Sequence, residues 1–225
     1  MQTSTLYVAG AVYLLLVANF YKESGGFNRH YNAMYAVWKV IPIVFLVVFA
    51  AVNGGGVSQK NRATCALGLF FGAIGDVLLG LSKHGLVPGA SAFGVGHLFY
   101  MSHFISRPLK IFRPLVYVTA AWTSVVAKMV FLPILEEHPI AVSILFIYSV
   151  LIALCLVMTA SHYIHRNAGD EDKVLIMAHG GYRIPLAEMI TLGTYYSAQY
   201  LILCGNIHSG LYVKQRYLTH ASNYG

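Results

Sequence analysis

The chain has 225 residues, of which 57% are hydrophobic and only 10% are charged, and its mean hydropathy is +0.63. Ordinary soluble domains carry about 25% charged residues, so this composition excludes a soluble globular protein and indicates one integral-membrane domain over residues 1–225. The net charge of +7 is spread over short loops and forms no basic segment interleaved with aromatic residues, which favours membrane topology and gives no indication of nucleic-acid binding.

Long uncharged runs predict transmembrane α-helices, because about 20 residues cross a hydrocarbon core about 30 Å thick. The first run lacks a basic n-region and an obvious cleavage site, so we expect it to be retained and not removed as a signal peptide. The predicted fold is therefore all-α, a polytopic membrane helix bundle of about seven helices. The runs are Thr3–Tyr21, Val40–Gln59, Ala63–Ser82, Gly85–Ser106, Leu115–Leu135, Pro139–Ile164 and one within Ile184–Val213.

The charged loops between these runs predict the orientation. Seven loop lysines and arginines fall on the side of the N-terminus and three on the other side, which places the N-terminus in the cytoplasm. Lys214 and Arg216 in the tail should also be cytoplasmic, and that requires an even number of crossings. The stretch Val174–Pro185 is too short and too broken by glycine and proline to cross, and it fits a re-entrant or interfacial segment. The topology stays open at this point.

Asp76 is the only ionisable residue in the run Ala63–Ser82. A carboxylate at bilayer depth costs about 2.5–3.5 kcal/mol on insertion scales, so such a residue usually faces a polar cavity, an ion path or a catalytic centre. The alternative is a structural carboxylate that is hydrogen-bonded between helices. Because Gly68, Gly72 and Gly75 lie on the same helical stripe, and small residues let a second helix approach closely, we expect Asp76 to face the bundle.

Five further polar residues lie in or beside the spans. His97 shares a helical stripe with Tyr100, and Tyr195 shares one with Gln199. A lone histidine in an apolar helix is more often structural than functional, tyrosines are frequent at membrane interfaces, and Gln199 is most simply an interhelical hydrogen-bonding residue. Lys39 precedes the second run, and we expect it to snorkel to the headgroup region; the alternative is a contact with a lipid phosphate.

The sequence predicts neither a disulfide framework nor a metal site. Cys65, Cys155 and Cys204 are scattered through different apolar runs without CxxC spacing. No pair of histidine and carboxylate residues has ligand spacing within a span, so we expect no metal and no cofactor.

Four strings of the chain resemble successive signatures of the lysoplasmalogenase family, also called the YhhN family. They occur in the family's order and cover most of the chain from Trp38 to Ile202: WKVIP (38–42), GLFFGAIGDVLL (68–79), FGVGHLFYMSHF (93–104) and TYYSAQYLI (194–202). The resemblance implies an eight-helix membrane enzyme, in animals mainly of the endoplasmic reticulum. Such an enzyme hydrolyses the vinyl-ether bond of lysoplasmalogens, which are 1-alkenyl-glycerophosphocholines or -ethanolamines, to a fatty aldehyde and a glycerophospho-base.

The resemblance also implies roles for individual residues. Vinyl ethers hydrolyse by protonation of the carbon β to oxygen, and a well-placed general acid contributes about 10²–10⁴-fold to such a step. Asp76 matches the family's Gly-Asp signature and would be this acid, while His97 and Tyr100 match its His-x-x-Tyr positions and would position the substrate or the water. Lys39 matches a lysine that would meet the substrate phosphate. Tyr195 and Gln199, in the last string, are the remaining candidates for substrate binding.

One family signature is missing. Members carry a Ser-Asp in a seventh helix, whereas here HRNAGDEDKVLIMAHG passes directly into GYRIPLAEM, and neither the cluster 170–172 nor Glu188 is a convincing replacement. We therefore hypothesise a shortened lysoplasmalogenase whose activity is reduced or absent. The alternative is a proton-linked transporter or a receptor that uses Asp76 as its protonation site. No inverted repeat supports a transporter, and no coupling motif supports a receptor.

Overall fold

The structure is a computed structural model that describes residues 2–28, 30–52, 59–105 and 110–165 together with Tyr195, Tyr196 and Gln199. All regular secondary structure in these residues is helical, which confirms the predicted all-α class. The elements are α1 (Gln2–Glu23), α2 (Ala33–Val52), α3 (Gln59–Leu81), α4 (Leu86–Ile105), α5 (Arg113–Val126), a π-helical turn η1 (Ala127–Phe131), a 3-10 turn η2 (Leu132–Ile134) and α6 (Pro139–His165).

The helices fit an integral membrane protein. Four helical stretches are long and apolar enough to cross a bilayer, namely α2, α3, Arg113–Ile134 and Pro139–Ser161. Helices α1 and α4 coincide with the predicted runs Thr3–Tyr21 and Gly85–Ser106. The predicted count of seven is not confirmed, because most of the seventh run lies outside the described residues. The stretch Val174–Pro185 and the site of the missing signature lie outside them as well.

The predicted boundaries of the second span are wrong. The helix runs from Ala33 to Val52, and Gln59 instead begins α3. The sequence prediction started the span after Lys39 because a charge normally marks a helix end. In the structure α2 begins at the Asn32 side chain, whose Oδ1 accepts a hydrogen bond from the Tyr35 amide at 2.7 Å, as an N-cap does. Lys39 therefore lies in the second turn of the helix.

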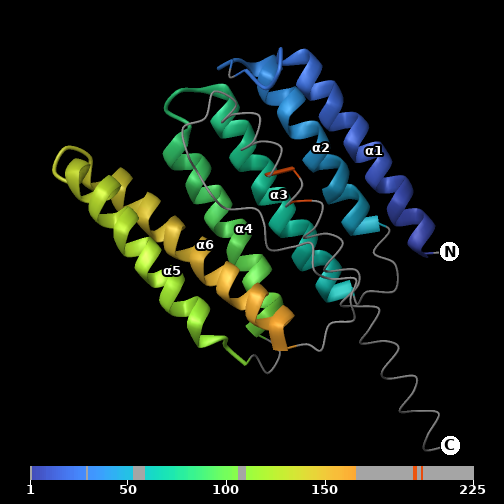
Figure 1. Ribbon diagram of the computed structural model, residues 1–225. Coiled ribbons are helices and arrows are strands. Elements are labelled where there is room, and N and C mark those ends of the chain that lie inside the picture. Colours follow the sequence, from blue (N-terminus) through green and yellow to red (C-terminus); the bar gives the residue numbers. More distant parts are fainter. Residues whose placement is uncertain are drawn as a thin grey trace, which may run out of the picture.

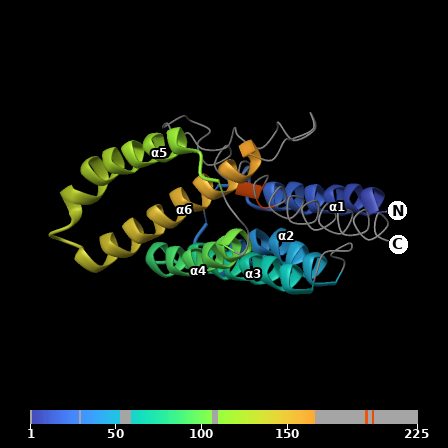
Figure 2. The same cartoon turned by 90° about the horizontal axis from the view of Figure 1, so that it is seen from below.

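The helices form a central row with flanking helices on one side. Helices α2, α3 and α4 lie side by side, and α3 packs extensively against both of its neighbours. Helix α1 packs on α2 and helix α6 on α4, both on the same side of the row, and α5 lies outermost against α6 (Figures 1 and 2). Tyr195 and Tyr196 lie against the central row, where the Tyr195 hydroxyl bonds Asp76 of α3 and the Tyr196 hydroxyl bonds the Lys39 carbonyl of α2.

Glycines allow α3 and α4 to approach closely. A Cβ atom at Gly68 would overlap the Tyr100 ring, one at Gly75 would lie 2.8 Å from the Phe93 ring, and one at Gly96 would lie 2.8 Å from the Gly68 carbonyl oxygen. Contacts this short leave no room for a larger side chain. The predicted small-residue stripe is confirmed at Gly68 and Gly75, and it brings α4 against the face of α3 that carries Asp76.

Candidate functional site

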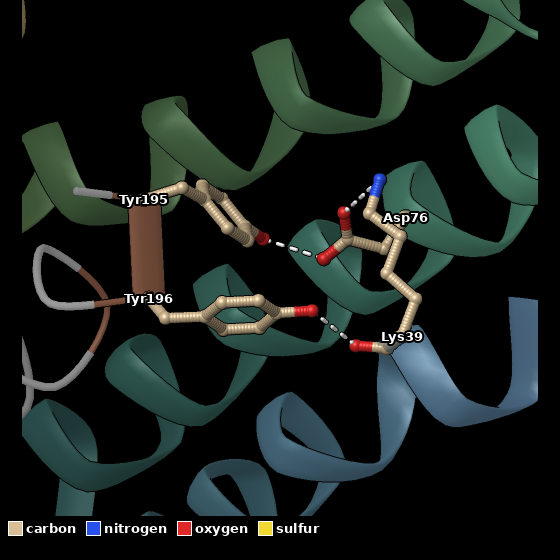
Figure 3. Close-up of polar contacts among 4 residues, drawn as sticks. All are labelled: Lys39, Asp76, Tyr195 and Tyr196. Carbon is tan, nitrogen blue, oxygen red and sulfur yellow. Dashed lines mark hydrogen bonds and ion pairs between the residues drawn. The ribbon is translucent and has the colours of Figure 1, made fainter. Parts of the chain in front are cut away.

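The centre of the site is a buried ion pair between α2 and α3. Lys39 Nζ lies 3.0 Å from Asp76 Oδ1, and the two residues are only 6% and 1% exposed (Figure 3). The prediction that Asp76 faces the bundle is confirmed. The expected snorkelling of Lys39 is wrong: an ammonium can stay at this depth because the carboxylate compensates its charge.

The second carboxylate oxygen is bonded as well. The Tyr195 hydroxyl donates a hydrogen bond to Asp76 Oδ2 at 2.6 Å (Figure 3). A hydrogen bond to a charged acceptor is shorter and roughly twice as strong as one between neutral groups. Both oxygens of the buried carboxylate therefore have a donor, which is the condition under which a buried charge is tolerated.

Tyr196 stabilises α2 just before a proline. Pro42 stands inside α2, where it has no N–H to donate and its ring disturbs the preceding turn. The Tyr196 hydroxyl donates to the Lys39 carbonyl oxygen at 2.8 Å, three residues before this proline. The carbonyl that Pro42 leaves without a backbone donor is that of Trp38, so Tyr196 bonds the carbonyl one residue further along α2. Tyr13 of α1 donates in turn to the Tyr196 carbonyl oxygen at 2.8 Å, so that α1 is joined to the same network.

Helix α4 adds a second polar group to the site. His97 Nδ1 lies 2.7 Å from the Phe93 carbonyl oxygen, which only accepts hydrogen bonds, so this nitrogen carries a proton. In a neutral ring Nε2 is then the acceptor nitrogen. The Tyr100 ring lies edge-on to the His97 ring, 6.1 Å between centroids, and the Tyr100 hydroxyl makes a long 3.5 Å hydrogen bond to Gln199 Oε1. The predicted interhelical hydrogen bond of Gln199 is thereby confirmed.

Aromatic rings connect the two polar groups. Phe93 packs edge-on against Tyr195, with 6.2 Å between ring centroids, and its carbonyl oxygen is the one bonded by His97. Tyr148 of α6 contacts both Phe93 and His97, at centroid distances of 6.3 and 5.8 Å. The site is thus enclosed by α2, α3, α4, α6 and the segment that carries Tyr195.

Comparison with known proteins identifies the family of the chain. The family model of the YhhN family matches residues 34–171, which is more than half of the chain. The chain belongs to the YhhN family. This family includes lysoplasmalogenases and is associated with hydrolase activity. Neither the curated proteins nor the solved structures contain a match to the chain.

The family match covers four of the six predicted site residues of this YhhN protein: Lys39, Asp76, His97 and Tyr100 lie within residues 34–171. Tyr195 and Gln199 lie beyond it. The structure nonetheless brings all six together, Lys39 and Tyr195 through direct bonds to Asp76, and Gln199 through Tyr100. Their roles in a reaction stay predictions.

Three residues of the site were missed by reasoning from the sequence: Tyr13, Tyr148 and Tyr196. The chain has 16 tyrosines, and their abundance at membrane interfaces hides those that bond inside the bundle. Pro42 gives no signal for Tyr196, since the carbonyl that this proline frees is that of Trp38 and not that of Lys39. As to metals, the described ranges contain no group of three histidine, cysteine, aspartate or glutamate side chains that could hold an ion.

Proposed function

We propose that this YhhN protein is a lysoplasmalogenase of the endoplasmic reticulum membrane that hydrolyses 1-alkenyl-glycerophosphocholine or -ethanolamine to a fatty aldehyde and a glycerophospho-base. The observation that carries the proposal is the buried Lys39–Asp76 pair with its Tyr195 donor, on the helices that the family model matches. A proton-bearing pair surrounded by apolar helices suits a reaction that begins with proton transfer to a lipid carbon.

The first step is protonation of the vinyl ether. The pair holds one transferable proton, on Nζ in the ionic form and on the carboxyl group in the neutral form, and both forms have zero net charge. Asp76 delivers this proton to the carbon β to the ether oxygen, which leaves an oxocarbenium ion on the lipid and one negative charge on the pair. That charge stabilises the cation beside it.

The second step is capture by water. We assign the proton of this water to His97, in which Nδ1 is bonded to the Phe93 carbonyl and Nε2 of the neutral ring is the basic nitrogen. Water adds to the oxocarbenium carbon, its proton finally returns to the Lys39–Asp76 pair, and the resulting hemiacetal breaks down to aldehyde and alcohol. In this scheme His97 takes the part for which a second carboxylate was expected, and the hypothesis of reduced or absent activity stays a prediction that the rate of aldehyde release tests.

Other assignments of the resemblance are kept as parts of the proposal. Tyr100 positions His97 by edge-on ring contact, and Tyr195 holds the Asp76 carboxylate. In the structure Lys39 pairs with the carboxylate of Asp76, the proposed acid. Its contact with a substrate phosphate stays a prediction. The cytoplasmic N-terminus rests on the distribution of loop charges.

Aldehyde release by the purified protein in a maltoside detergent tests the proposal. With an alkenyl lysolipid in D2O we expect an aldehyde that carries one deuterium on its α carbon, and no reaction with the saturated alkyl-ether analogue. Aldehyde added to the protein in D2O controls for exchange. An Asp76→Asn variant should lose about 10²–10⁴-fold in rate. Full activity of this variant would remove Asp76 from the mechanism, and ligand-dependent charge movement without aldehyde would favour the transporter alternative.

A further inference from the structure

The hydroxyl of Tyr148 is a polar group of the site that the proposed function does not use. Tyr148 lies on α6 and is half-buried. Its ring stacks on Phe93, with 6.3 Å between centroids, and meets the His97 ring edge-on at 5.8 Å. The Asp76 carboxylate also acts electrostatically on the Tyr148 hydroxyl. This tyrosine therefore contacts His97 and lies within range of the buried ion pair.

The Tyr148 hydroxyl differs from the other tyrosine hydroxyls of the site. Those donate to a backbone carbonyl, to an amide oxygen or to a carboxylate, in Tyr13, Tyr100, Tyr195 and Tyr196. Among the described residues, none makes a hydrogen bond to the Tyr148 hydroxyl. Its oxygen also keeps accessible surface, since the buried side-chain atom without a partner in the described ranges is Arg62 Nε. The hydroxyl is thus open to a molecule that enters the site.

The depth of Tyr148 excludes the usual reason for a tyrosine in a membrane helix. Such tyrosines lie at the membrane interface, where water bonds the hydroxyl. Tyr148 lies about 14 Å along α6 from Pro139 and about 26 Å from His165. A hydroxyl at this depth costs free energy unless it is bonded, and phenylalanine would make the same ring contacts without that cost. The hydroxyl therefore indicates a polar partner that is part of the reaction.

Water is the partner that the chemistry requires here. The second step of the proposed function needs a water molecule beside the oxocarbenium carbon, in a site enclosed by apolar helices. A tyrosine hydroxyl both donates and accepts hydrogen bonds, so it can hold a water molecule. Tyr148 contacts His97, the base assigned to this water, and the cation forms beside Asp76. The hydroxyl is therefore suited to keep the water between the base and the cation.

We propose that the Tyr148 hydroxyl holds the water molecule that captures the oxocarbenium ion, a role that rests on the proposed function. The water oxygen forms a bond to the oxocarbenium carbon, one O–H bond of the water breaks, and its proton passes to His97. The lipid becomes a neutral hemiacetal, and the positive charge moves from the lipid to His97. Tyr148 keeps its own proton and contributes by position, because a water fixed beside the carbon reacts faster than one that must be found.

The rate of aldehyde release by a Tyr148→Phe variant tests this role. Phenylalanine keeps the ring contacts with Phe93 and His97 and removes only the hydroxyl. We expect kcat on an alkenyl lysolipid in a maltoside detergent to fall about 10- to 100-fold, because the water is no longer positioned. Tyr117→Phe removes the same hydroxyl from an exposed tyrosine of α5 and is the matched control, which should keep the rate of the natural chain.

The solvent isotope effect separates a role in water capture from a loss of packing. In the natural chain the slow step transfers a proton to carbon, so aldehyde release should be slower in D2O. In Tyr148→Phe water capture becomes the slow step, and the ratio of the rates in H2O and D2O should fall toward one. His97→Gln removes the base of the same step and should lower this ratio as well. A variant that is only poorly packed would be slow with the ratio of the natural chain.

The outcomes distinguish this inference from the proposed function. An unchanged rate in Tyr148→Phe, a lower rate with the isotope effect of the natural chain, or loss of the folded state would overturn the role of Tyr148 and keep the lysoplasmalogenase. Absence of aldehyde release by the natural chain would overturn the proposed function, and the role of Tyr148 with it.

Discussion

The row α2–α3–α4 and the hairpin α5–α6 are both rich in apolar residues, but they differ in how much of their surface other helices cover. Helix α3 packs between α2 and α4, α1 packs on α2 and α6 on α4, and the Lys39–Asp76 pair in the row is almost completely buried. Helix α5 contacts α6 and the η1 turn, has no buried residue in the described structure, and leaves Tyr117, Trp122 and others more than half exposed.

The difference follows from what each kind of side chain needs. Apolar side chains are as stable against lipid tails as against protein, whereas a charge at this depth requires a partner from another helix. The buried ion pair therefore lies where helices pack on both sides. The hairpin can present its apolar surface to lipid, and the two regions should respond differently to substitution.

The largest effect should come from separating the buried charges. Lys39→Met leaves the Asp76 carboxylate uncompensated, and breaking such a pair costs about 3–5 kcal/mol. Replacing both charges, as Lys39→Met with Asp76→Leu, should restore most of this stability, because apolar replacements of a whole pair are often neutral. Thermal unfolding in detergent measures both variants. Equal destabilisation by the single and the double variant would show that the pair is not the source of the cost.

Tyr195→Phe should cause the next-largest loss of stability. It removes a hydrogen bond to a charged acceptor, worth about 1.5–3 kcal/mol, whereas Tyr196→Phe removes one to a neutral carbonyl, worth about 0.5–1.5 kcal/mol. Each substitution deletes one hydroxyl from adjacent residues, so each controls for the other. Denaturation of the two variants under identical conditions gives the order, and a larger loss for Tyr196→Phe would contradict the assignment of the Asp76 bond as the stronger one.

The close approach of α3 and α4 predicts a contrast between two glycines on one stripe. Gly68→Ala forces its Cβ into the Tyr100 ring and should cost about 1–3 kcal/mol. At Gly72 no atom of the described residues lies within 4 Å of an added Cβ, so Gly72→Ala should be close to neutral. Comparison of their unfolding midpoints checks this, and similar losses at both positions would mean that overlap with Tyr100 is not what matters.

Substitutions in the outermost helix, α5, should have the smallest effect on stability. Tyr117→Leu and Trp122→Leu replace exposed apolar side chains of α5 by another apolar side chain, and each should change stability by no more than about 0.5 kcal/mol. Thermal unfolding in the same detergent tests this. A loss comparable to that of Gly68→Ala would mean that α5 packs against protein and not against lipid.

Much of this arrangement was predictable from residue pattern. Apolar runs predicted the helices, and the glycine spacing before Asp76 predicted which face of α3 meets another helix, because both signals are local. Family resemblance, carried by four short strings, placed six residues in one site before any distance was known. The structure brings Lys39 and Tyr195 into contact with Asp76, and the family model confirms the resemblance.

The partners could not be predicted in the same way. Lys39 was expected at the membrane surface because the local sequence contains no partner for its charge. Only tertiary packing brings its ammonium group 3.0 Å from the carboxylate of Asp76, 37 positions later. The start of α2 was misplaced because the same charge was taken to mark a helix end. Tyr196 was missed because its hydroxyl bonds a backbone carbonyl, and a backbone group has no sequence signature.

The central claim is that the Lys39–Asp76 pair is the reactive centre and not only a structural contact. Aldehyde release by the Lys39→Met, Asp76→Leu double variant tests it most directly, because replacement of both charges is expected to restore most of the stability that a single replacement loses. We predict that the folded double variant loses at least about 10²-fold in rate on an alkenyl lysolipid. Aldehyde release by the folded variant at the rate of the natural chain would contradict the claim.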